Sequence, residues 1–485
     1  MLQQQQTISF SDYSSLYDLI IPKDNLLRQI KELVDFSFVY QELNDKYCHT
    51  NGRTAESPIR MFKYLLLKTI YNISDVDVVE RSRYDMSFKY FLELTPEETN
   101  LINPSSLTKF RRLRLKDMEL LDLLIKKTVS IAIEKGVLKS KTIIIDATHT
   151  HARSNPISTA KIIILHSKEL IKAVKSVDDS IILPEQSEEP KFSSVISTAK
   201  LIASSVDAVA SIANMPAVKE RLNMLKESIS DAEVRCVTSK DTDARIGHKT
   251  AHTSFFGYKT HIAMSDERII TAATVTSGEK GDGPQLPELI EKTETAGIEV
   301  EAIVADTAYS SKSNLELAKS KNIKLAASLN PVVNGNGMHK LHFEYNKDAD
   351  LYVCPAGHMA LYKEKKNRIN DDRHRNAKII YYFDVDKCKI CPLRDGCYKP
   401  GAKSRTYHVT IKTDEQVEQL KFQESDEFKK LQKKRYKIEA KNAELKNVLG
   451  YDRALSYGLS CMEMQGALTI FTANLKRILK LMHKA

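Results

Sequence analysis

The 485-residue sequence has no tryptophan, no long apolar run and no basic, apolar start. Without tryptophan, any stacking by an aromatic side chain has to use tyrosine or phenylalanine. The longest apolar stretches, such as 61–67 and 162–165, are bounded or broken by lysine and polar residues, well short of the ~20 residues that cross a bilayer. The first residues, Gln3 to Gln6 and then Thr7, do not resemble a secretory signal. We therefore expect a cytoplasmic protein without membrane spans.

Cysteine is scarce, and the number of cysteines is odd. Seven cysteines in a long chain without a predicted secretory signal argue against a disulfide framework. Three of them, Cys48, Cys236 and Cys461, look like ordinary small apolar residues. The other four lie in one region and need a separate explanation.

That region contains Cys354, Cys388, Cys391 and Cys397. Cys388 and Cys391 have the spacing of a tight knuckle, and the segment from Cys354 to His358 is its distant partner. Four thiolates, or three with His358, match the ligands of a closed tetrahedral Zn²⁺ site. A reduced, metal-free set of thiols is the alternative.

The charge is positive and unevenly distributed. The formal net charge is +10, and five of the eight residues in 109–116 are basic. The segment from Glu427 to Ala485 is also rich in lysine and arginine. Such clusters favour a polyanionic partner, because each neutralised phosphate releases counterions. Lysine-rich helices are as often simply solvated faces, so charge alone leaves both interpretations open.

Periodicity divides the chain into regions. Residues 1–137 have helical spacing and end in a basic helix at 107–115, preceded by turn and N-cap residues at 103–106. The region 138–330 has a helical insertion at about 155–232 and β character at 143–147, 258–264, 269–275, 300–305 and 323–327. The region 331–411 is a small Cys-rich, zinc-ribbon-like insertion. The region 412–485 has helices at 413–449 and 462–482. This order predicts an α/β fold with a mixed sheet.

Two aspartates directly follow short apolar runs in predicted strands. Asp146 follows 143–145, and Asp306 follows 302–305. A carboxylate at the end of a buried strand lies at the rim of the sheet, so two of them can converge on hard divalent cations. The pair therefore indicates metal-assisted phosphoryl chemistry.

Other polar residues lie near these aspartates. If the first strand continues, Thr148 and Thr150 share a face with Asp146, and His149 and His151 share the other. We interpret the histidines as contacts around the site or to a DNA backbone, with plain surface histidines as the alternative. Asp282 is expected to cap the helix that follows it.

The predicted long helix carries a third acidic candidate. At about 100° per residue, Arg435, Glu439 and Lys446 fall within a narrow sector. Glu439 would thus border a buried seam, between cations that can hold phosphates. An ordinary Arg–Glu pair on a helix surface, contributing about 0.2–0.5 kcal/mol, is the alternative.

The segment Arg435-x3-Glu439-x6-Lys446 resembles the signature of bacterial insertion-sequence transposases of the DDE class, in the IS4/IS5-like supergroup. That group has tyrosine three positions before the arginine, where this chain has Gln432. The resemblance extends along the chain, in segments 34–38, 52–55, 57–112, 256–261 and 305–311.

The resemblance implies an RNase H-like catalytic core with Asp146, Asp306 and Glu439 as catalytic residues. They would bind two Mg²⁺ ions, for which Mn²⁺ substitutes, about 3.5–4 Å apart. Arg435 and Lys446 would contact phosphates. The expected activity is cleavage at the ends of an insertion sequence and joining of the 3′-hydroxyl ends to target DNA.

The expected partners also follow from the resemblance. They are double-stranded DNA, as terminal inverted repeats and target, and a second copy of the chain in a homodimeric synaptic complex. Arg111, Arg112 and Arg114 of the helical N-terminal domain would help to recognise the ends. The location would be prokaryotic, at the nucleoid when DNA is bound. The absence of tryptophan neither supports nor excludes a DNA-hairpin intermediate.

Two alternatives from other classes remain. A transposase-derived DNA-binding protein without catalysis would show loss of an acidic residue, and none is lost. A stand-alone RNase H-like nuclease would leave the N-terminal domain and the insertions unexplained.

Overall fold

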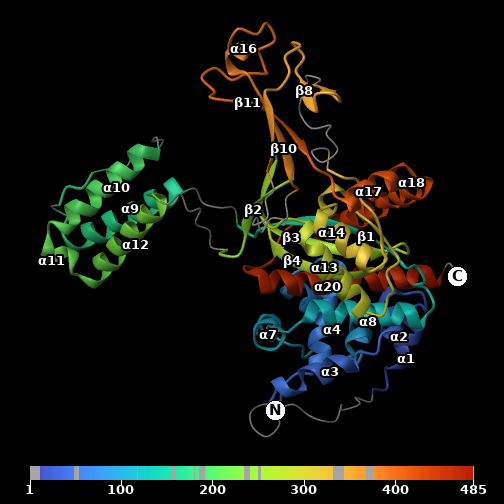
Figure 1. The fold of residues 1–485 in the computed structure, drawn as a ribbon. Coiled ribbons are helices and arrows are strands. Elements are labelled where there is room, and N and C mark those ends of the chain that lie inside the picture. Colours follow the sequence, from blue (N-terminus) through green and yellow to red (C-terminus); the bar gives the residue numbers. More distant parts are fainter. Residues whose placement is uncertain are drawn as a thin grey trace.

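A mixed sheet lies at the centre of the molecule, with helices on both faces and two further units that project from it (Figure 1). The predicted α/β class with a helical N-terminal region is confirmed. The computed structural model describes residues 11–48, 54–116, 118–154, 159–179, 181–184, 192–233, 241–249, 253–330, 343–366 and 376–483. Cys236 lies outside these ranges. So do Gly52 and Arg53, which are part of one of the segments that resemble the transposase family.

All regular elements described in the N-terminal region are helices. Its helices are α1 (Ser15–Ile20), α2 (Leu26–Leu33), α3 (Ser37–Leu43), η1 (Asn44–Lys46), α4 (Pro58–Tyr71), α5 (Asp75–Arg81), α6 (Met86–Leu92), α7 (Pro104–Phe110), η2 (Arg111–Leu115) and α8 (Leu120–Glu134). Asn25, Ser74, Asp85 and Asn103 cap helix starts by accepting hydrogen bonds from first-turn N–H groups. The predicted basic helix begins earlier than expected, at Pro104, because Asn103 is its cap, and its last turn, η2, is a π-helix.

The central strand of the sheet is β1 (Thr142–His151). It pairs antiparallel with β3 (Ser254–Ser265) and parallel with β5 (Ala302–Val304). The other strands are β6 (Lys324–Ala326), parallel to β5, and β2 (Arg245–His248) and β4 (Ile270–Ser277), both antiparallel to β3. The apolar runs before Asp146 and Asp306 are buried on both faces, as their composition predicts.

Different helices cover the two faces of the sheet. On one face, α13 (Leu286–Thr295) and α14 (Lys312–Ser320) share a core with Ile143 and Ile145. The short 3₁₀ turns η3 (Gly283–Gln285) and η4 (Thr307–Tyr309) precede these helices. On the other face, Ile144 belongs to a larger core that extends through α8 and α20 into the N-terminal helices.

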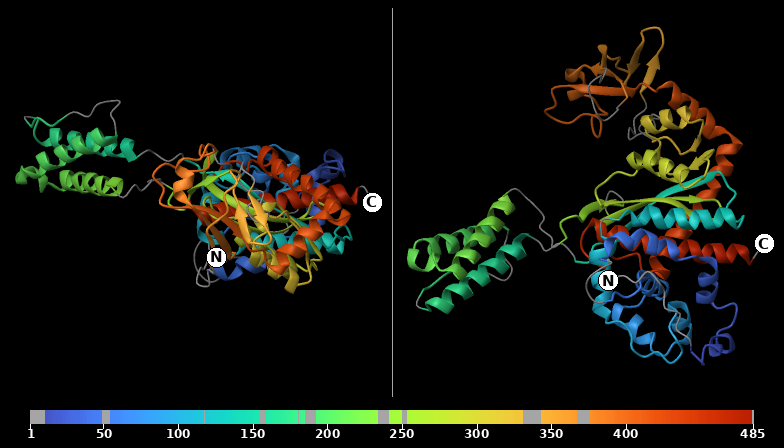
Figure 2. Two further views of the ribbon diagram at one scale, coloured as in Figure 1. Left: turned by 45° about the horizontal axis from the view of Figure 1, so that its top comes forward. Right: turned by 90° about the horizontal axis from the view of Figure 1, so that it is seen from below.

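Helix α20 (Leu459–Met482) joins the sheet to the N-terminal region. It lies between the sheet and α4 (Figure 2), beside α8, which also packs on β4, and it contacts β3, β4, α4 and α8. Asn474, fully buried in its middle, donates to the Ile270 carbonyl and to Thr128 Oγ1 (2.8 and 2.9 Å) and accepts from the Ile270 N–H (2.8 Å). One side chain therefore links α20, β4 and α8.

The segment between β1 and β2 forms a helical unit that projects from the sheet (Figures 1 and 2). Its helices, α9 (Thr159–Val177), α10 (Phe192–Asp207), α11 (Ala210–Ala213) and α12 (Pro216–Glu233), lie where helices were predicted. They share a core of their own that includes Ile163, Leu170, Val195, Ile202 and Leu222.

The segment between β6 and α17 forms the second projecting unit. It contains β7 (Glu344–Asn346), β8 (Leu351–Val353), β9 (Tyr362–Lys366), β10 (Lys378–Phe383), α16 (Val385–Lys389) and β11 (Arg405–Thr410). The strands form a β11-β10-β9 sheet and a β7-β8 hairpin.

The prediction of one continuous helix at 413–449 is wrong. The segment contains α17 (Asp414–Glu424), α18 (Asp426–Gln432), η5 (Lys433–Arg435), α19 (Tyr436–Ala443) and η6 (Glu444–Val448). Ser425 has an extended backbone (φ −71°, ψ 152°), and its side chain caps α18 by accepting from the Phe428 N–H. Apolar periodicity runs across this break, so spacing alone did not reveal it. No helix in the described ranges is long and apolar enough to cross a membrane.

Candidate active site

Asp306 lies just past the end of β5, as predicted, whereas Asp146 lies within β1, which continues to His151, so the prediction that Asp146 ends its strand is wrong. The parallel register of β1 and β5 pairs Ile144 with Val304. Continuing this register by two residues places Asp146 beside Asp306. Asp306 also starts the turn η4, where its Oδ1 accepts a hydrogen bond from the Ala308 N–H at 2.9 Å. This bond fixes the second carboxylate at the strand end.

The environment of Asp146 disfavours its ionised form. Burial raises the pKa of this carboxyl to about 6, against the opposing effects of the Ala147 N–H and the Arg435 cation. The negative charges of Asp306 and Asp282 raise the pKa of Asp146 further. Oxygen donors with mutually repelling charges suit a hard divalent cation, whose binding relieves the repulsion. The donor set therefore fits Mg²⁺.

One stripe of the helical segment from η5 to η6 faces Asp146. Arg435, Glu439, Asn442 and Lys446 follow the spacing i, i+4, i+7, i+11. Asn442 Nδ2 donates to Asp146 Oδ2 at 3.1 Å, and both Arg435 and Lys446 interact electrostatically with Asp146. Glu439 lies between these residues on the stripe, with an exposed side chain. Sequence reasoning missed Asn442, although its spacing from Glu439 places it on the same face.

The three predicted acids do not form a closed site. In the part of the chain that is described, no group of three or more His, Cys, Asp or Glu side chains is arranged to hold a metal ion. Asp146 and Asp306 are brought together, whereas Glu439 lies on the same helical stripe as Asn442 without joining them.

Gln432 fixes the start of the signature segment to the sheet. Its Nε2 donates to the carbonyl of Ala305, at 3.2 Å, and to that of Ala326. Ala305 immediately precedes Asp306, so this amide ties the helical segment to the strand end that carries the second acid. The sequence showed only that Gln432 departs from the tyrosine of the resembled group.

Asp282 does not cap the following helix with its side chain, so that prediction is wrong. Its carboxylate lies 2.9 Å from Lys259 Nζ and 3.7 Å from His261 Nδ1. These basic groups on β3 attract the carboxylate away from the helix start. The nearby Tyr309 hydroxyl is fully buried and finds no hydrogen-bond partner among the described residues. Burial, followed by the charges of Asp282, Asp146 and Asp306, raises the pKa of Tyr309.

The residues after Asp146 alternate as predicted. Thr148 and Thr150 are buried, whereas His149 and His151 pack on Phe255, with ring centroids 4.9 and 6.2 Å away. Lys446 Nζ lies 3.4 Å from both ring nitrogens of His149. Burial, then Lys446, lowers the pKa of His149 to about 3, so this ring is neutral at physiological pH.

The three predicted DNA-binding arginines differ in their surroundings. Arg111 donates to both carboxylate oxygens of Asp75. Arg114 donates to the Lys46 carbonyl, and its guanidinium lies 4.2 Å from the centre of the Tyr47 ring. Arg112 is exposed. Arg111 and Arg114 therefore have internal partners, and Arg112 is the one that faces solvent.

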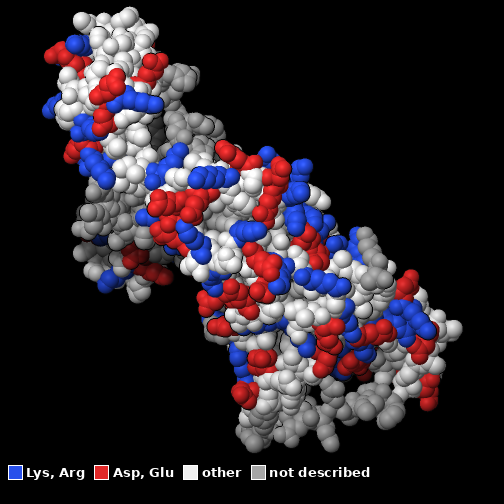
Figure 3. Space-filling model, turned by 45° about the vertical axis from the view of Figure 1, so that its right-hand side comes forward, with Lys and Arg blue, Asp and Glu red and all other residues white. Residues whose placement is uncertain are grey.

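Arg112 lines a groove of about 1090 Å³ between the N-terminal helices and the segment before α20. The lining includes five cationic side chains, Lys68, Arg111, Arg112, Lys116 and Arg153, but only two acidic ones, Asp75 and Asp243. On the face drawn in Figure 3, by contrast, basic and acidic side chains are interspersed. An excess of positive charge in a groove is typical of phosphate-backbone binding.

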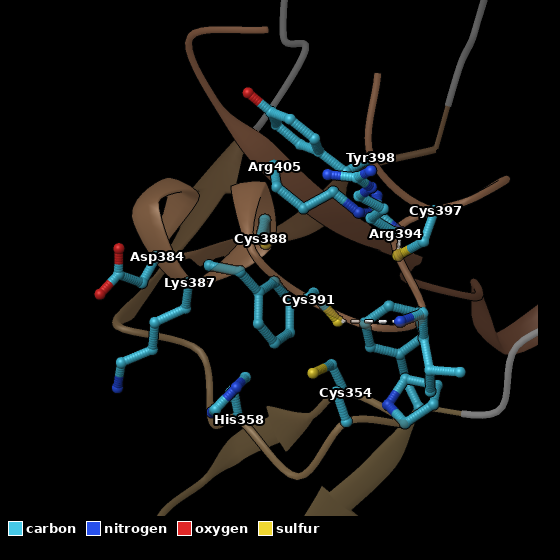
Figure 4. A pocket seen from close by; sticks show the side chains of 15 residues that line it. Cys354, His358, Asp384, Lys387, Cys388, Cys391, Arg394, Cys397, Tyr398 and Arg405 are labelled. Carbon is cyan, nitrogen blue, oxygen red and sulfur yellow. Dashed lines mark hydrogen bonds between the residues drawn. The ribbon is translucent and has the colours of Figure 1, made fainter. Parts of the chain in front are cut away.

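The four predicted zinc ligands line one small cavity in the second projecting unit (Figure 4). Cys48 and Cys461, interpreted from the sequence as ordinary small apolar residues, are both exposed. Cys461 lies in the first turn of α20 and lines the basic groove.

Two family models match the chain. One, described as a transposase domain (DUF772), matches residues 15–113, and the other, described as a transposase DDE domain, matches residues 353–479. The second match includes Glu439, whereas Asp146 and Asp306 precede it. No curated protein and no solved structure gave a significant match. The two matches support a DDE transposase, and the DDE domain implies an RNase H-like fold, with which the sheet order β4-β3-β1-β5-β6 agrees.

Proposed function

We propose that the protein cleaves DNA at the ends of its own insertion sequence and joins the 3′-hydroxyl ends to target DNA. The observation that carries this proposal is the convergence of Asp146, Asp306 and the stripe containing Asn442 beside the end of β5 in the mixed sheet. The two transposase-domain matches lie elsewhere in the chain than the two aspartates, and the second of them includes the stripe. The proposal includes membership of the IS4/IS5-like supergroup, for which Arg435-x3-Glu439-x6-Lys446 is the motif.

Asp146, Asp306 and Glu439 are the proposed catalytic residues and Mg²⁺ ligands. Two bound Mg²⁺ ions, or Mn²⁺ in their place, would activate the attacking hydroxyl and stabilise the leaving oxygen. Asn442 orients Asp146 by donating to its Oδ2. Glu439, whose side chain is exposed, has to turn toward this pair when the substrate binds.

Arg435 and Lys446 are the proposed phosphate contacts beside the acids. Arg435 Nε is buried and has no hydrogen-bond partner within the described ranges, so a phosphate oxygen would satisfy it. Lys446 lies between Asp146 and His149, where burial followed by Lys249 lowers its pKa to about 8. A phosphate beside this ammonium would favour its charged form.

The basic groove is the proposed binding site for the terminal inverted repeats. Arg112, Lys116 and Arg153 line it as cations that can contact the phosphate backbone. Arg111 acts indirectly in this scheme, because its bonds to Asp75 hold the wall of the groove. Arg114 supports the N-terminal fold by its bond to the Lys46 carbonyl. Synapsis of two ends and target capture would require a homodimer, which we propose on the family resemblance.

The test is cleavage of a duplex that carries the element's terminal repeat, with Mg²⁺ present. We expect Asp146→Asn, Asp306→Asn and Glu439→Gln each to abolish nicking while repeat binding is retained. Glu424→Gln, at an exposed carboxylate of α17, is the matched control and should cleave normally. Wild-type cleavage by Asp146→Asn would refute the proposal.

The same assay separates the alternatives. Repeat binding by the wild-type chain without Mg²⁺-dependent nicking would indicate a non-catalytic DNA-binding protein. Nicking without joining of the 3′-hydroxyl end to a second duplex would indicate a nuclease.

A further inference from the structure

The unit from β7 to β11 has very little apolar core. Only Ala360, Tyr381 and Phe383 are buried in its cluster among the residues described, and every residue of β9 is exposed. A unit of this size gains little stability from such a core, and small scaffolds of this kind usually contain disulfides or a structural metal. The four cysteines of this unit form no disulfides.

Four thiols from separate parts of this unit line one cavity of about 30 Å³ (Figure 4). Cys354 follows β8, Cys388 lies in α16, and Cys391 and Cys397 lie in the loop between α16 and β11. The volume exceeds the ~10–15 Å³ that one water-sized occupant needs. An occupant bound by all four thiols would therefore link the hairpin, the helix and the loop before β11.

Local hydrogen bonds shape both arms of the cavity. The Leu393 N–H donates to Cys391 Sγ at 3.4 Å, and Arg405 donates to Cys397 Sγ at 3.3 Å. In the other arm, the Cys354 N–H donates to the His358 carbonyl, and the Gly357 N–H donates to the Cys354 carbonyl, both at 2.8 Å. Donors that point at sulfur stabilise thiolates, and such supporting contacts orient metal ligands.

We infer that Cys354, Cys388, Cys391 and Cys397 bind a structural Zn²⁺ ion. Four soft thiolates select a tetrahedral zinc ion over the hard cations that suit the aspartates. In the described structure no three of these side chains are yet at ligand distance, so the thiols have to rotate into the cavity that they line. The ion would bind away from the aspartate pair and stabilise this unit whatever its catalytic role.

The charge around the cavity supports this site. Four thiolates with one Zn²⁺ leave a net charge of −2, and the same cavity is lined by three cationic residues, Lys387, Arg394 and Arg405, and one acidic residue, Asp384. These cations offset the excess negative charge. His358 also lines the cavity, but the four sulfurs complete a tetrahedral ligand set without its ring.

The first test is metal content. The 485-residue chain, purified under reducing conditions without added metal, should contain about one zinc ion per molecule. Elemental mass spectrometry measures this zinc content. Cys388→Ser/Cys391→Ser should lower this content about tenfold or more, because the remaining ligands bind weakly. Cys461→Ser, at an exposed cysteine outside the unit, should keep one zinc ion.

The second test identifies the ligands and does not depend on the stability of a double variant. After Co²⁺ replaces Zn²⁺, the thiolate-to-cobalt charge-transfer absorption should fall in Cys354→Ser and remain unchanged in His358→Ala. A zinc-free wild-type protein whose four thiols react freely with a thiol reagent while folded would overturn the inference. Neither readout involves DNA, so failure here would be distinct from failure of the proposed function.

Discussion

Replacement of Gln432 by leucine should slow DNA cleavage more than it destabilises the fold. The amide donates to the carbonyls of Ala305 and Ala326, and each such bond contributes about 0.5–1.5 kcal/mol net. The Ala326 carbonyl keeps a partner, the Ala305 N–H at 3.2 Å. We therefore expect the free energy of unfolding to fall by about 1–2 kcal/mol.

The effect on cleavage should be larger, because Gln432 holds the segment that carries Glu439 against the strand end before Asp306. A displacement of about 1 Å between catalytic groups can slow a reaction about 100-fold. The expected result is a roughly 10- to 100-fold lower rate of single-turnover nicking, with unchanged affinity for the terminal repeat. Labelled duplex and excess protein give this rate directly.

Gln419 offers a matched control. From α17 it donates to the carbonyls of Leu325 and Ala327, both at 2.8 Å, so Gln419→Leu loses the same number of bonds at the same strand. It is also more buried than Gln432, and its loss should lower the melting temperature at least as much. Its bonds do not reach Asp306, so the nicking rate should stay within about twofold of wild type at a temperature where both variants are folded. Equal loss of rate in both variants, or a wild-type rate for Gln432→Leu, would refute the positioning role.

Three further predictions concern stability and DNA affinity. Asn474→Leu leaves three buried polar groups without their partner and should lower the free energy of unfolding by about 3–5 kcal/mol in urea titrations; a loss below about 1 kcal/mol would contradict the hydrogen bonding described. Burial raises the pKa of Asp75, but hydrogen bonds from two cations outweigh it and hold this pKa below its usual value. The ionised Asp75 therefore stabilises the fold above about pH 3.9, and this stabilisation is lost as the pH falls. Asp75→Asn should have a lower free energy of unfolding at pH 7, and that free energy should fall less steeply in acid. Arg112→Ala should reduce the slope of log affinity against log salt for the terminal repeat by about 1. Arg114→Ala should instead destabilise the fold and leave this slope unchanged. The reverse pattern would show that Arg114, and not Arg112, contacts the phosphate backbone.

Short-range patterns in the sequence were sufficient to predict the buried apolar runs before Asp146 and Asp306. They did not show that β1 continues past Asp146 to His151, because that extension depends on pairing with β3. Helical spacing likewise placed Arg435, Glu439 and Lys446 on one face. These predictions rest on period and composition, which are local properties.

The remaining features depend on contacts between distant residues. Asn442 reaches Asp146 across 296 positions in the sequence, and no local pattern distinguishes it from any polar helix residue. Asp282 was predicted as a cap because the sequence does not show that Lys259 faces it. The break at Ser425 was missed because apolar periodicity continues across it, although serine followed by two acidic residues is a cap signal.

The position of α20 between the sheet and the N-terminal helices has a consequence for synthesis on the ribosome. The apolar surfaces of α8 that it covers are complete by Glu134, but α20 begins only at Leu459. At about 5–20 residues per second, the 325 intervening residues (459 − 134) take roughly 15–65 s to translate. During that time the nascent chain exposes apolar surface that only its last described helix can cover, so it needs protection from aggregation. The edge that holds Asp306 likewise gains its α19 stripe only after Tyr436 is translated, which confines any cutting of DNA to chains translated beyond α19.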